Sequence, residues 1–280
     1  MGKSETALEV AKAFNAVIIN GDAFQCYKEM NIGVAKPPKE YFDIVPHKLF
    51  SFVDVNHDYS IAEYQQNLRK EIDACLNENK NVVIVGGSGL YIRSALYDYE
   101  FSTQSAVDMS KYNSLTNEEL HRELAKIDPD EAEKIHQNNR KRVLRAIEIY
   151  LSQGKTKSDV IAEQQHKLVY DAKFFVRNME RETLYSLIDK RVDKMIEEGL
   201  LDEVTTLVNK YGKDSKSFQA IGYKELIPVI EGKEKLEDAV ELIKKNTRNY
   251  AKRQVTYIRH QFPVKFYKNT QDLMEILKNE

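Results

Sequence analysis

The sequence predicts an α/β protein with a parallel sheet, because short apolar runs alternate with helical patterns along the chain. Residues 16–19 and 82–85 are unbroken runs of Ala, Val and Ile, as expected for strands that are buried on both faces. A helix is expected before the first run, where apolar residues recur at helical spacing from 7 to 14. Another is expected ahead of the second run, where Ser60 and Glu63 form a capping box. Ligand sites in parallel sheets lie at the carboxyl ends of strands, so the loops after both runs are candidate sites.

The composition is that of an ordinary globular protein, with 42% apolar and 31% charged residues among 280. This length predicts one or two domains and excludes small disulfide scaffolds, collagen-like chains and wholly disordered chains. The longest apolar runs are far shorter than the roughly 20 residues of a membrane helix, and no signal or transit pattern is present. With only two cysteines, a soluble protein of the reducing cytoplasm is expected.

Between residues 101 and 167 the strand signal disappears and helical patterns take over. An apolar stripe from Val143 to Leu151 is expected to form the core of this region. The sequence therefore predicts an α/β core made of residues 1–100 and 168–280, interrupted by a helical insertion. Helix boundaries in the insertion are marked by Thr116 with Glu119, Asp128 with Pro129, and Gly154. After the insertion, the pattern predicts a strand at 173–176, helices at 181–198, 200–211 and 236–261, and a last strand at 264–267.

Two stretches without acidic residues concentrate positive charge, although the formal net charge of the chain is only −2. One lies between Glu133 and Glu148, and the other between Glu241 and Asp272. Each could bind a phosphate polymer or could be a solvated helix face. Aromatic residues interleave the second stretch, where they could stack on bases or pack the helix onto the body. The basic residues are Lys134, Arg140, Lys141, Arg142 and Arg145 in the first stretch, and Lys244, Lys245, Arg248, Lys252, Arg253, Arg259, Lys265 and Lys268 in the second.

Gly2-Lys3-Ser4, directly before a helical pattern, resembles the second half of a phosphate-binding loop. In the complete motif, backbone N–H groups surround the phosphates, the lysine neutralises outer oxygens and the hydroxyl is a magnesium ligand. The first glycine and the preceding strand of that motif do not stand before Gly2 in this sequence. An ordinary helix start is the alternative interpretation of these three residues.

Two loops after the predicted strands contain residues suited to chemistry. Asp22 could act as a base or as a magnesium ligand, or it could simply shape a turn. The loop Gly86–Gly89 could let a ligand approach the backbone closely, or it could be a flexible turn. The six histidines show neither i, i+4 pairing nor cysteine partners, so a zinc site is not expected.

Taken together, these segments resemble one family over nearly the whole chain: the tRNA dimethylallyltransferases, also called tRNA isopentenyltransferases. Within the matching segments, Ala23 stands where that family has serine, and Val34 stands where it has threonine. The resemblance is carried by Gly2-Lys3-Ser4 with Ala7-Leu8, by Gly21-Asp22-Ala23-Phe24-Gln25-Cys26-Tyr27, by Met30–Pro37, by Pro46-His47, by Gly86-Gly87-Ser88-Gly89-Leu90-Tyr91, by Asp128-Pro129 to Glu148, by Ile221-Gly222-Tyr223-Lys224-Glu225 and by Thr247–Thr256.

The resemblance implies a P-loop-like sheet and a transfer reaction. A dimethylallyl group would pass from dimethylallyl diphosphate to the N6 amine of the adenosine 3′-adjacent to the anticodon in tRNA, releasing diphosphate. Gly2, Lys3 and Ser4 would bind the diphosphate, with Mg²⁺ at Ser4. Lys3 and Ser4 would stabilise the leaving group, and Asp22 would accept the proton of the amine.

The resemblance also implies how tRNA would bind. The adenine would be extruded into a channel, and the anticodon stem-loop would be held by basic and motif residues. The channel residues are Asp22, Ala23, Phe24, Gln25 and Ser88. The remaining tRNA-binding residues are Lys141, Arg142, Arg145, Gln219, Gly222, Tyr223, Lys224, Arg248, Lys252 and Arg253. A monomer that does not associate with membranes is expected.

Three alternatives remain open at this point. A P-loop small-molecule kinase or NTPase would use Lys3 and Ser4 on ATP. An inactive RNA-binding fragment, with an incomplete phosphate loop, would bind tRNA without transfer and would tolerate loss of Asp22. A prenyltransferase that acts on free adenine nucleotides would not need the two basic stretches.

Overall fold

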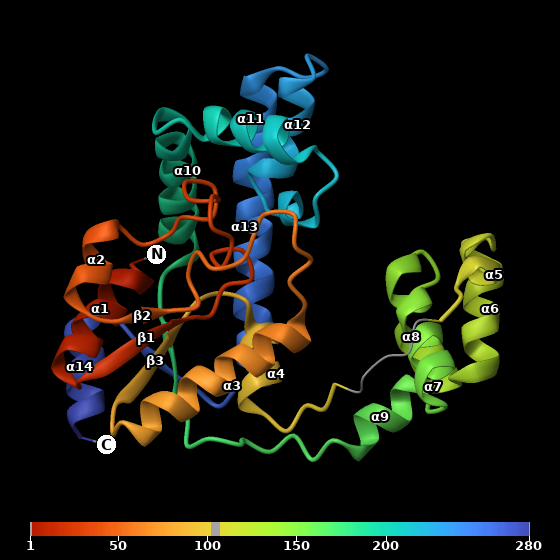
Figure 1. Ribbon diagram of the computed structural model, residues 1–280, viewed down its shortest axis with the longest axis horizontal. Coiled ribbons are helices and arrows are strands. Elements are labelled where there is room, and N and C mark those ends of the chain that lie inside the picture. Colours follow the sequence, from red (N-terminus) through yellow and green to blue (C-terminus); the bar gives the residue numbers. More distant parts are fainter. Residues whose placement is uncertain (1, 102–106, 280) are drawn as a thin grey trace. The chain divides into compact units, whose positions relative to one another are not determined.

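The computed structural model describes residues 2–101 and 107–279, which fall into two compact units (Figure 1). The first unit contains the chain up to residue 96 and from residue 170 onward, and the second contains residues 97–169. The helical insertion predicted from the sequence spans residues 101–167. A tRNA-contacting role for the second unit stays a prediction.

The first unit combines parallel strands with covering helices, as the alternating pattern predicts. Four short elements were not predicted, because two to nine residues give little periodic signal. They are β2 (His47–Lys48), α2 (Lys39–Ile44), α12 (Tyr223–Ile230) and α14 (Thr270–Lys278). Its strands are β1 (Ala16–Asn20), β2 (His47–Lys48), β3 (Asn81–Val85), β4 (Phe174–Arg177) and β5 (Val264–Tyr267). Its helices are α1 (Lys3–Ala13), α2 (Lys39–Ile44), α3 (Ile61–Asn77), α4 (Gly89–Leu96), α10 (Arg181–Glu197), α11 (Leu200–Tyr211), the 3-10 helix η1 (Lys216–Gln219), α12 (Tyr223–Ile230), α13 (Leu236–Gln261) and α14 (Thr270–Lys278).

All pairings between these strands are parallel, which confirms the predicted strand direction. β1 lies at the centre of a three-stranded sheet of order β2-β1-β3, and its register with β3 runs from Ala16 opposite Asn81 to Asn20 opposite Val85. β4 and β5 form a separate pair. The carboxyl ends of β1 and β3 therefore lie side by side (Figure 1).

The central strand is covered on both faces, because all five residues of β1 are buried. Ala16 and Ile18 pack with the α1 residues Ala7, Leu8 and Ala11. Alternate residues of a strand point to the opposite face, and α3 packs against β1 and β3. Burial of one isoleucine side chain stabilises the fold by about 1.5–3 kcal/mol, so this strand anchors the site that follows it.

The second unit is helical, with α5 (Ser110–Asn113), α6 (Asn117–Ile127), α7 (Pro129–Lys134), α8 (Arg140–Gln153) and α9 (Lys157–Glu163). The predicted capping box at Thr116 and the left-handed cap at Gly154 are both confirmed. The stripe of α8 is buried only in part, because Val143 is fully buried whereas Tyr150 and Leu151 are exposed. The two exposed residues lie in the last turn of a helix of 14 residues whose packing partner α6 has 11.

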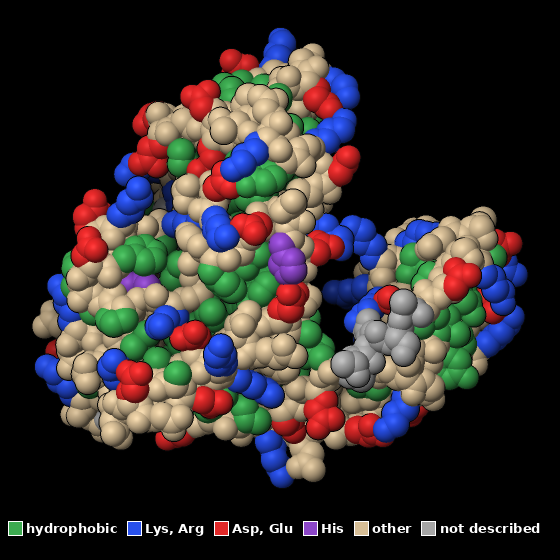
Figure 2. All heavy atoms as spheres, viewed as in Figure 1, with side chains coloured by type: hydrophobic (Ala, Val, Ile, Leu, Met, Phe, Trp, Pro, Cys, Tyr) green, Lys and Arg blue, Asp and Glu red, His purple; other side chains and the backbone are tan. Residues whose placement is uncertain are grey.

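Charge is mixed rather than segregated over much of the surface. Figure 2 shows acidic and basic side chains interspersed over the region of α11 and α12, in line with the near-zero net charge. Among residues 2–101 and 107–279, no helix combines the length and the apolar character needed to cross a membrane.

Candidate active site

The two predicted loops meet at the carboxyl edge of the three-stranded sheet. The Gly21 N–H donates to the Val85 carbonyl (2.8 Å), and the Ser88 N–H donates to the Gly21 carbonyl (3.1 Å). The Ala23 N–H donates to Ser88 Oγ (2.9 Å). The backbones approach so closely that a Cβ at Gly86 would lie 2.0 Å from the Gly21 carbonyl oxygen. The structure thus brings the two candidate loops together through their backbones.

Asp22 lies in a tightly braced turn after β1. Its Oδ1 accepts the Phe24 N–H (2.9 Å). The fully buried Asn20 accepts the Asp22 N–H through Oδ1 (2.8 Å) and donates from Nδ2 to the carbonyls of Asp22 (2.9 Å) and Leu49 (3.0 Å). The Tyr64 hydroxyl donates to the Asn20 carbonyl (2.9 Å). These bonds fix where the half-buried Asp22 carboxylate stands.

Asp22, Lys3 and Arg191 form one electrostatically coupled group. Desolvation raises the pKa of Asp22 above its ordinary value, and this is opposed by the Phe24 N–H and by the charges of Lys3 and Arg191. Desolvation lowers the pKa of Lys3, and the charge of Asp22 opposes that shift. Both Lys3 and Arg191 nevertheless keep solvent-accessible surface.

The Gly2–Ser4 segment forms the start of α1. Gly2 adopts a left-handed φ of 80° immediately before Lys3, the first helical residue, and its carbonyl accepts the Thr6 N–H (3.1 Å). Ser4 lies half-buried in the first turn. The guanidinium of Arg177, at the end of β4, stands so close that a Cβ on Gly2 would lie 2.8 Å from its Nη1. This helix end favours anions through its free N–H groups and its dipole.

The side-chain amide of Gln25 bonds to the backbone of its own loop. Its Nε2 donates to the carbonyls of Val34 and Ala35, both at 2.9 Å. Lys36 closes the same loop by donating to the Tyr27 carbonyl (2.5 Å), and burial lowers the pKa of Lys36 to about 8. The amide nitrogen of Gln25 therefore holds the chain, and a contact of Gln25 with a base stays a prediction.

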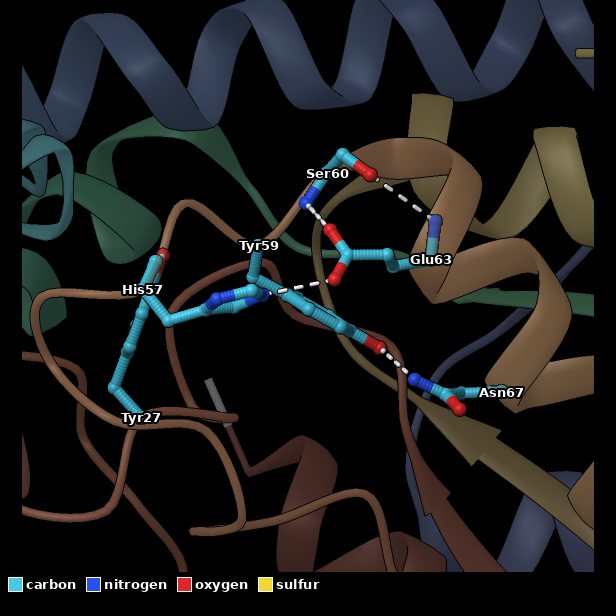
Figure 3. A network of polar contacts seen from close by, with 6 residues as sticks. All are labelled: Tyr27, His57, Tyr59, Ser60, Glu63 and Asn67. Carbon is cyan, nitrogen blue, oxygen red and sulfur yellow. Dashed lines mark hydrogen bonds and ion pairs between the residues drawn. The ribbon is translucent and has the colours of Figure 1, made fainter. Parts of the chain in front are cut away.

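A polar network holds the other side of this segment (Figure 3). The Tyr27 hydroxyl donates to the His57 carbonyl (3.3 Å), and His57 Nε2 lies 2.8 Å from Glu63 Oε1. Glu63 and Ser60 form the predicted capping box at the start of α3. The network ties the segment after Asp22 to the start of α3, a helix of 17 residues.

Glu203, in the first turn of α11, fastens the neighbouring loop. Its carboxylate accepts the N–H groups of Asn31 (3.0 Å), Ile32 (2.9 Å) and Gly33 (3.2 Å). The Tyr223 hydroxyl donates to Glu203 Oε1 (2.5 Å), and a Cβ at Gly33 would lie 2.4 Å from the Tyr223 ring. Tyr223 is therefore a packing residue of this loop.

Residues predicted to bind tRNA near α12 divide into buried and exposed members. The Tyr223 side chain is completely buried, so a tRNA contact through it is not supported. Gly222 is buried as well, and its N–H donates to Glu225 Oε2 (2.8 Å). Gln219 and Lys224 are exposed, and for these two the tRNA contact stays a prediction.

Residues predicted to bind tRNA on the basic helices also differ in availability. Lys141 and Arg142, in the first turn of α8, are exposed, whereas Arg145 is paired with Glu148 (2.7 Å). All three side chains are exposed, and a local i, i+3 ion pair within α8 engages Arg145.

On α13 the same difference separates Arg248 from its neighbours. Arg248 Nη1 lies 2.5 Å from Asp189 Oδ1 of α10, which uses its charge inside the protein. Lys252 and Arg253 are exposed and contribute to a shallow hollow of about 430 Å³. Its lining residues are Asn249, Lys252, Arg253, Thr256 and Tyr257.

Sequence reasoning missed three residues that the structure brings to the site. Asn20 had a signal, because it is a polar residue that ends an apolar strand. Tyr250 had a signal as well, because it lies in the motif segment Thr247–Thr256. Arg191 had none, since it lies in an ordinary helical pattern far along the chain from Asp22. Tyr250 lies near Ser88 and Asp22: burial is the main cause that raises the pKa of Tyr250, the charge of Asp22 adds to it, and Ser88 opposes it.

A parallel sheet with a glycine loop, a carboxylate and a lysine at a helix start defines a class of enzymes that handle phosphate groups at the strand ends. A family model described as IPP transferase matches residues 25–261. The tRNA dimethylallyltransferases of Anoxybacillus flavithermus and Bacillus velezensis are 42% and 45% identical, covering 97% and 94% of this chain and 88% and 86% of the relatives. The chain belongs to this family, the tRNA dimethylallyltransferases.

Solved structures agree with this family. A tRNA isopentenylpyrophosphate transferase from Staphylococcus epidermidis is 39% identical with a TM-score of 0.74, covering 99% of this chain and 94% of that chain. A eukaryotic dimethylallyltransferase acting on tRNA is 29% identical with a TM-score of 0.83, covering 96% and 72%. The fold of this chain is that of these transferases.

Proposed function

We propose that this protein transfers a dimethylallyl group from dimethylallyl diphosphate to the N6 amine of the adenosine 3′-adjacent to the anticodon in tRNA. The observation that carries the proposal is the meeting of Asp22, Lys3 and the Gly86–Gly89 loop at one sheet edge. The site thus offers a base, a phosphate-binding helix start and a loop that allows close approach. Family membership favours this reaction over a kinase or NTPase that would use the same helix start on ATP.

In the proposed reaction the amine nitrogen forms a bond to the allylic carbon while the bond from that carbon to the diphosphate oxygen breaks. Asp22 takes one proton from the amine, and diphosphate leaves with the bonding electrons. Desolvation raises the pKa of Asp22, which makes its carboxylate a stronger base than one in water. The bonds from Asn20 and Phe24 keep it in one orientation.

Lys3, Arg191 and the start of α1 would stabilise the negative charge that grows on the diphosphate. Magnesium would be held by the Ser4 hydroxyl together with diphosphate oxygens and water. In the part of the chain that the structure describes, no three His, Cys, Asp or Glu side chains gather as a metal site, which fits an ion shared with its substrate. When bound, the ion supplies charge neutralisation of the leaving group.

The proposed RNA partner is the anticodon stem-loop, whose adenine must leave the stack to reach Asp22. Ala23 and Phe24 directly follow Asp22, and Ser88 Oγ accepts the Ala23 N–H, so these residues would line the channel. The exposed Lys141, Arg142, Lys252 and Arg253 would contact phosphates. We assign the reaction to the cytoplasm and to a monomer; both cysteines are buried and free, as a reducing compartment allows.

The decisive experiment measures transfer of labelled dimethylallyl to unmodified tRNA in the presence of magnesium. We expect incorporation by the wild-type protein, a loss of about 10²–10⁴-fold in kcat for Asp22→Asn, and no incorporation into tRNA lacking the target adenosine. ATP turnover without RNA would instead support the kinase alternative. Binding of tRNA without transfer would support the RNA-binding alternative.

The pH dependence of transfer provides a second check. A general base works only when it is deprotonated, and the pKa of Asp22 is raised in the free protein. The acid limb of kcat/KM should therefore have its midpoint above 3.8, the ordinary value for aspartate. A midpoint at or below that value would argue against Asp22 as the base.

A further inference from the structure

One face of α13 grips the glycine loop after β3. Tyr250, Gln254 and Tyr257 are spaced at i, i+4 and i+7, so they lie on the same side of the helix. Gln254 Nε2 donates to the Gly87 carbonyl (2.8 Å). The Tyr257 ring stands against Gly89, where an added Cβ would lie 2.7 Å from Tyr257 Cδ1. The loop is therefore held from a helix more than 160 residues later in the chain.

The contact between Gln254 and Gly87 is closely fitted. A Cβ at Gly87 would lie 2.1 Å from Gln254 Nε2, far inside any normal contact distance. The structure describes no positive φ at Gly87, so the backbone conformation itself does not require glycine there. The amide of Gln254 occupies the space that a side chain at Gly87 would take.

Tyr250 continues the same contact toward the catalytic turn. The side chains of Ser88 and Gln254 lie close enough to the Tyr250 hydroxyl to lower its pKa, against the larger effect of burial. Ser88 in turn binds both neighbours of Asp22: its Oγ accepts the Ala23 N–H (2.9 Å), and its N–H donates to the Gly21 carbonyl (3.1 Å). Hydrogen bonds at Gly87 and Ser88, two consecutive residues of the loop, thus connect α13 to the residues on either side of Asp22.

We propose that Gln254 and Tyr250 are positioning residues that set the Asp22 carboxylate through the glycine loop; this rests on the proposed function. Neither residue needs to touch the substrates for this role. The exposed Lys252 and Arg253 lie between Tyr250 and Gln254 on α13. A tRNA that binds Lys252 and Arg253 would therefore contact the helix that positions Asp22. Displacing a catalytic group by about 1 Å can cost about 100-fold in rate.

The first test is steady-state transfer kinetics of Gln254→Ala and Tyr250→Phe in the full chain. We expect kcat to fall about 10- to 100-fold, with KM for dimethylallyl diphosphate and the Kd for tRNA changed less than about 2-fold. The acid limb of the pH profile should also move, because the surroundings of Asp22 change. Matched controls are Gln271→Ala on α14 and Tyr185→Phe on α10, which should behave as wild type.

Two results separate this inference from the proposed function. An inactive wild-type protein would reject the transfer reaction and the positioning role with it. An active wild-type protein whose two variants keep kcat and the pH profile unchanged would reject the positioning role alone.

The second test reads the contact without activity, by thermal unfolding of Gly87→Ala, Gln254→Ala and the double variant. We expect Gly87→Ala to lower Tm in the wild-type background and to lower it less when Gln254 is already alanine, because the clash is removed. Strictly additive changes in Tm would show that Gln254 does not fill the space beside Gly87. That outcome would overturn the proposed path from α13 to Asp22.

Discussion

The start of α12 and the middle of α13 both lie in motif segments, and they differ in what their polar groups do. Both contain motif residues that were expected to bind tRNA. At the start of α12, Tyr223 and Glu225 are buried, and their polar atoms bond to Glu203, Gly222 and Asn246. There the motif holds loops together, and its polar groups are already engaged.

The middle of α13 divides by face. Its inner side holds the glycine loop through Gln254, whereas Lys252 and Arg253 point to solvent. Arg248, one turn earlier, is paired with Asp189. The lesson is that a basic or polar motif becomes a binding surface only where the tertiary structure leaves its groups unengaged.

The largest expected effect is loss of stability in Tyr223→Ala. Removing a fully buried aromatic side chain leaves a cavity and deprives Glu203 of a donor, so unfolding free energy should fall by about 3–5 kcal/mol. Urea denaturation measures this directly. If Tyr223 instead faced RNA, stability would be retained and tRNA affinity would fall.

A smaller loss of stability is expected for Glu203→Gln. The amide keeps the size of the side chain but weakens the bonds from three consecutive N–H groups and from Tyr223, at a cost of about 1–3 kcal/mol. Denaturant midpoints test it, with Glu234→Gln as the control. A change no larger than that of the control would contradict the role of Glu203 as the fastening point of the loop.

Lys252→Ala with Arg253→Ala should leave stability within about 0.5 kcal/mol, because both side chains are exposed. If both contact phosphates, the slope of log Kobs for tRNA against log salt should drop by about 1 for each residue. Filter binding over a range of salt concentrations measures the slope. An unchanged slope would remove α13 from the RNA interface.

The smallest effect is expected for Arg248→Gln. Its ion pair with Asp189 is partly exposed, so its loss should cost only about 0.2–1 kcal/mol. Since its charge is used inside the protein, the salt dependence of tRNA binding should match that of the wild type. A slope reduced as much as by a change at Lys252 would show that Arg248 leaves Asp189 to bind RNA.

Much of the local structure was predictable because its signals are local. The helix at 236–261 and the strand at 264–267 have the predicted bounds, since an amphipathic pattern and Pro263 mark them. The capping boxes at Ser60 and Thr116 are confirmed for the same reason. The pairing of the loops after β1 and β3 followed from the rule that parallel strands end on one edge.

By itself, the sequence determined the fold class, the parallel direction of the strands, the family, and the position of Asp22 beside the glycine loop. Those features depend on periodicity and on motifs only a few residues long. Tertiary structure alone decided that Arg191 comes near enough to Asp22 for its charge to act on the carboxylate, that Gln254 holds Gly87, and that Tyr223 is buried. Each of these joins segments that lie far apart in the chain, and only the packing of helices on the sheet determines which of their side chains meet.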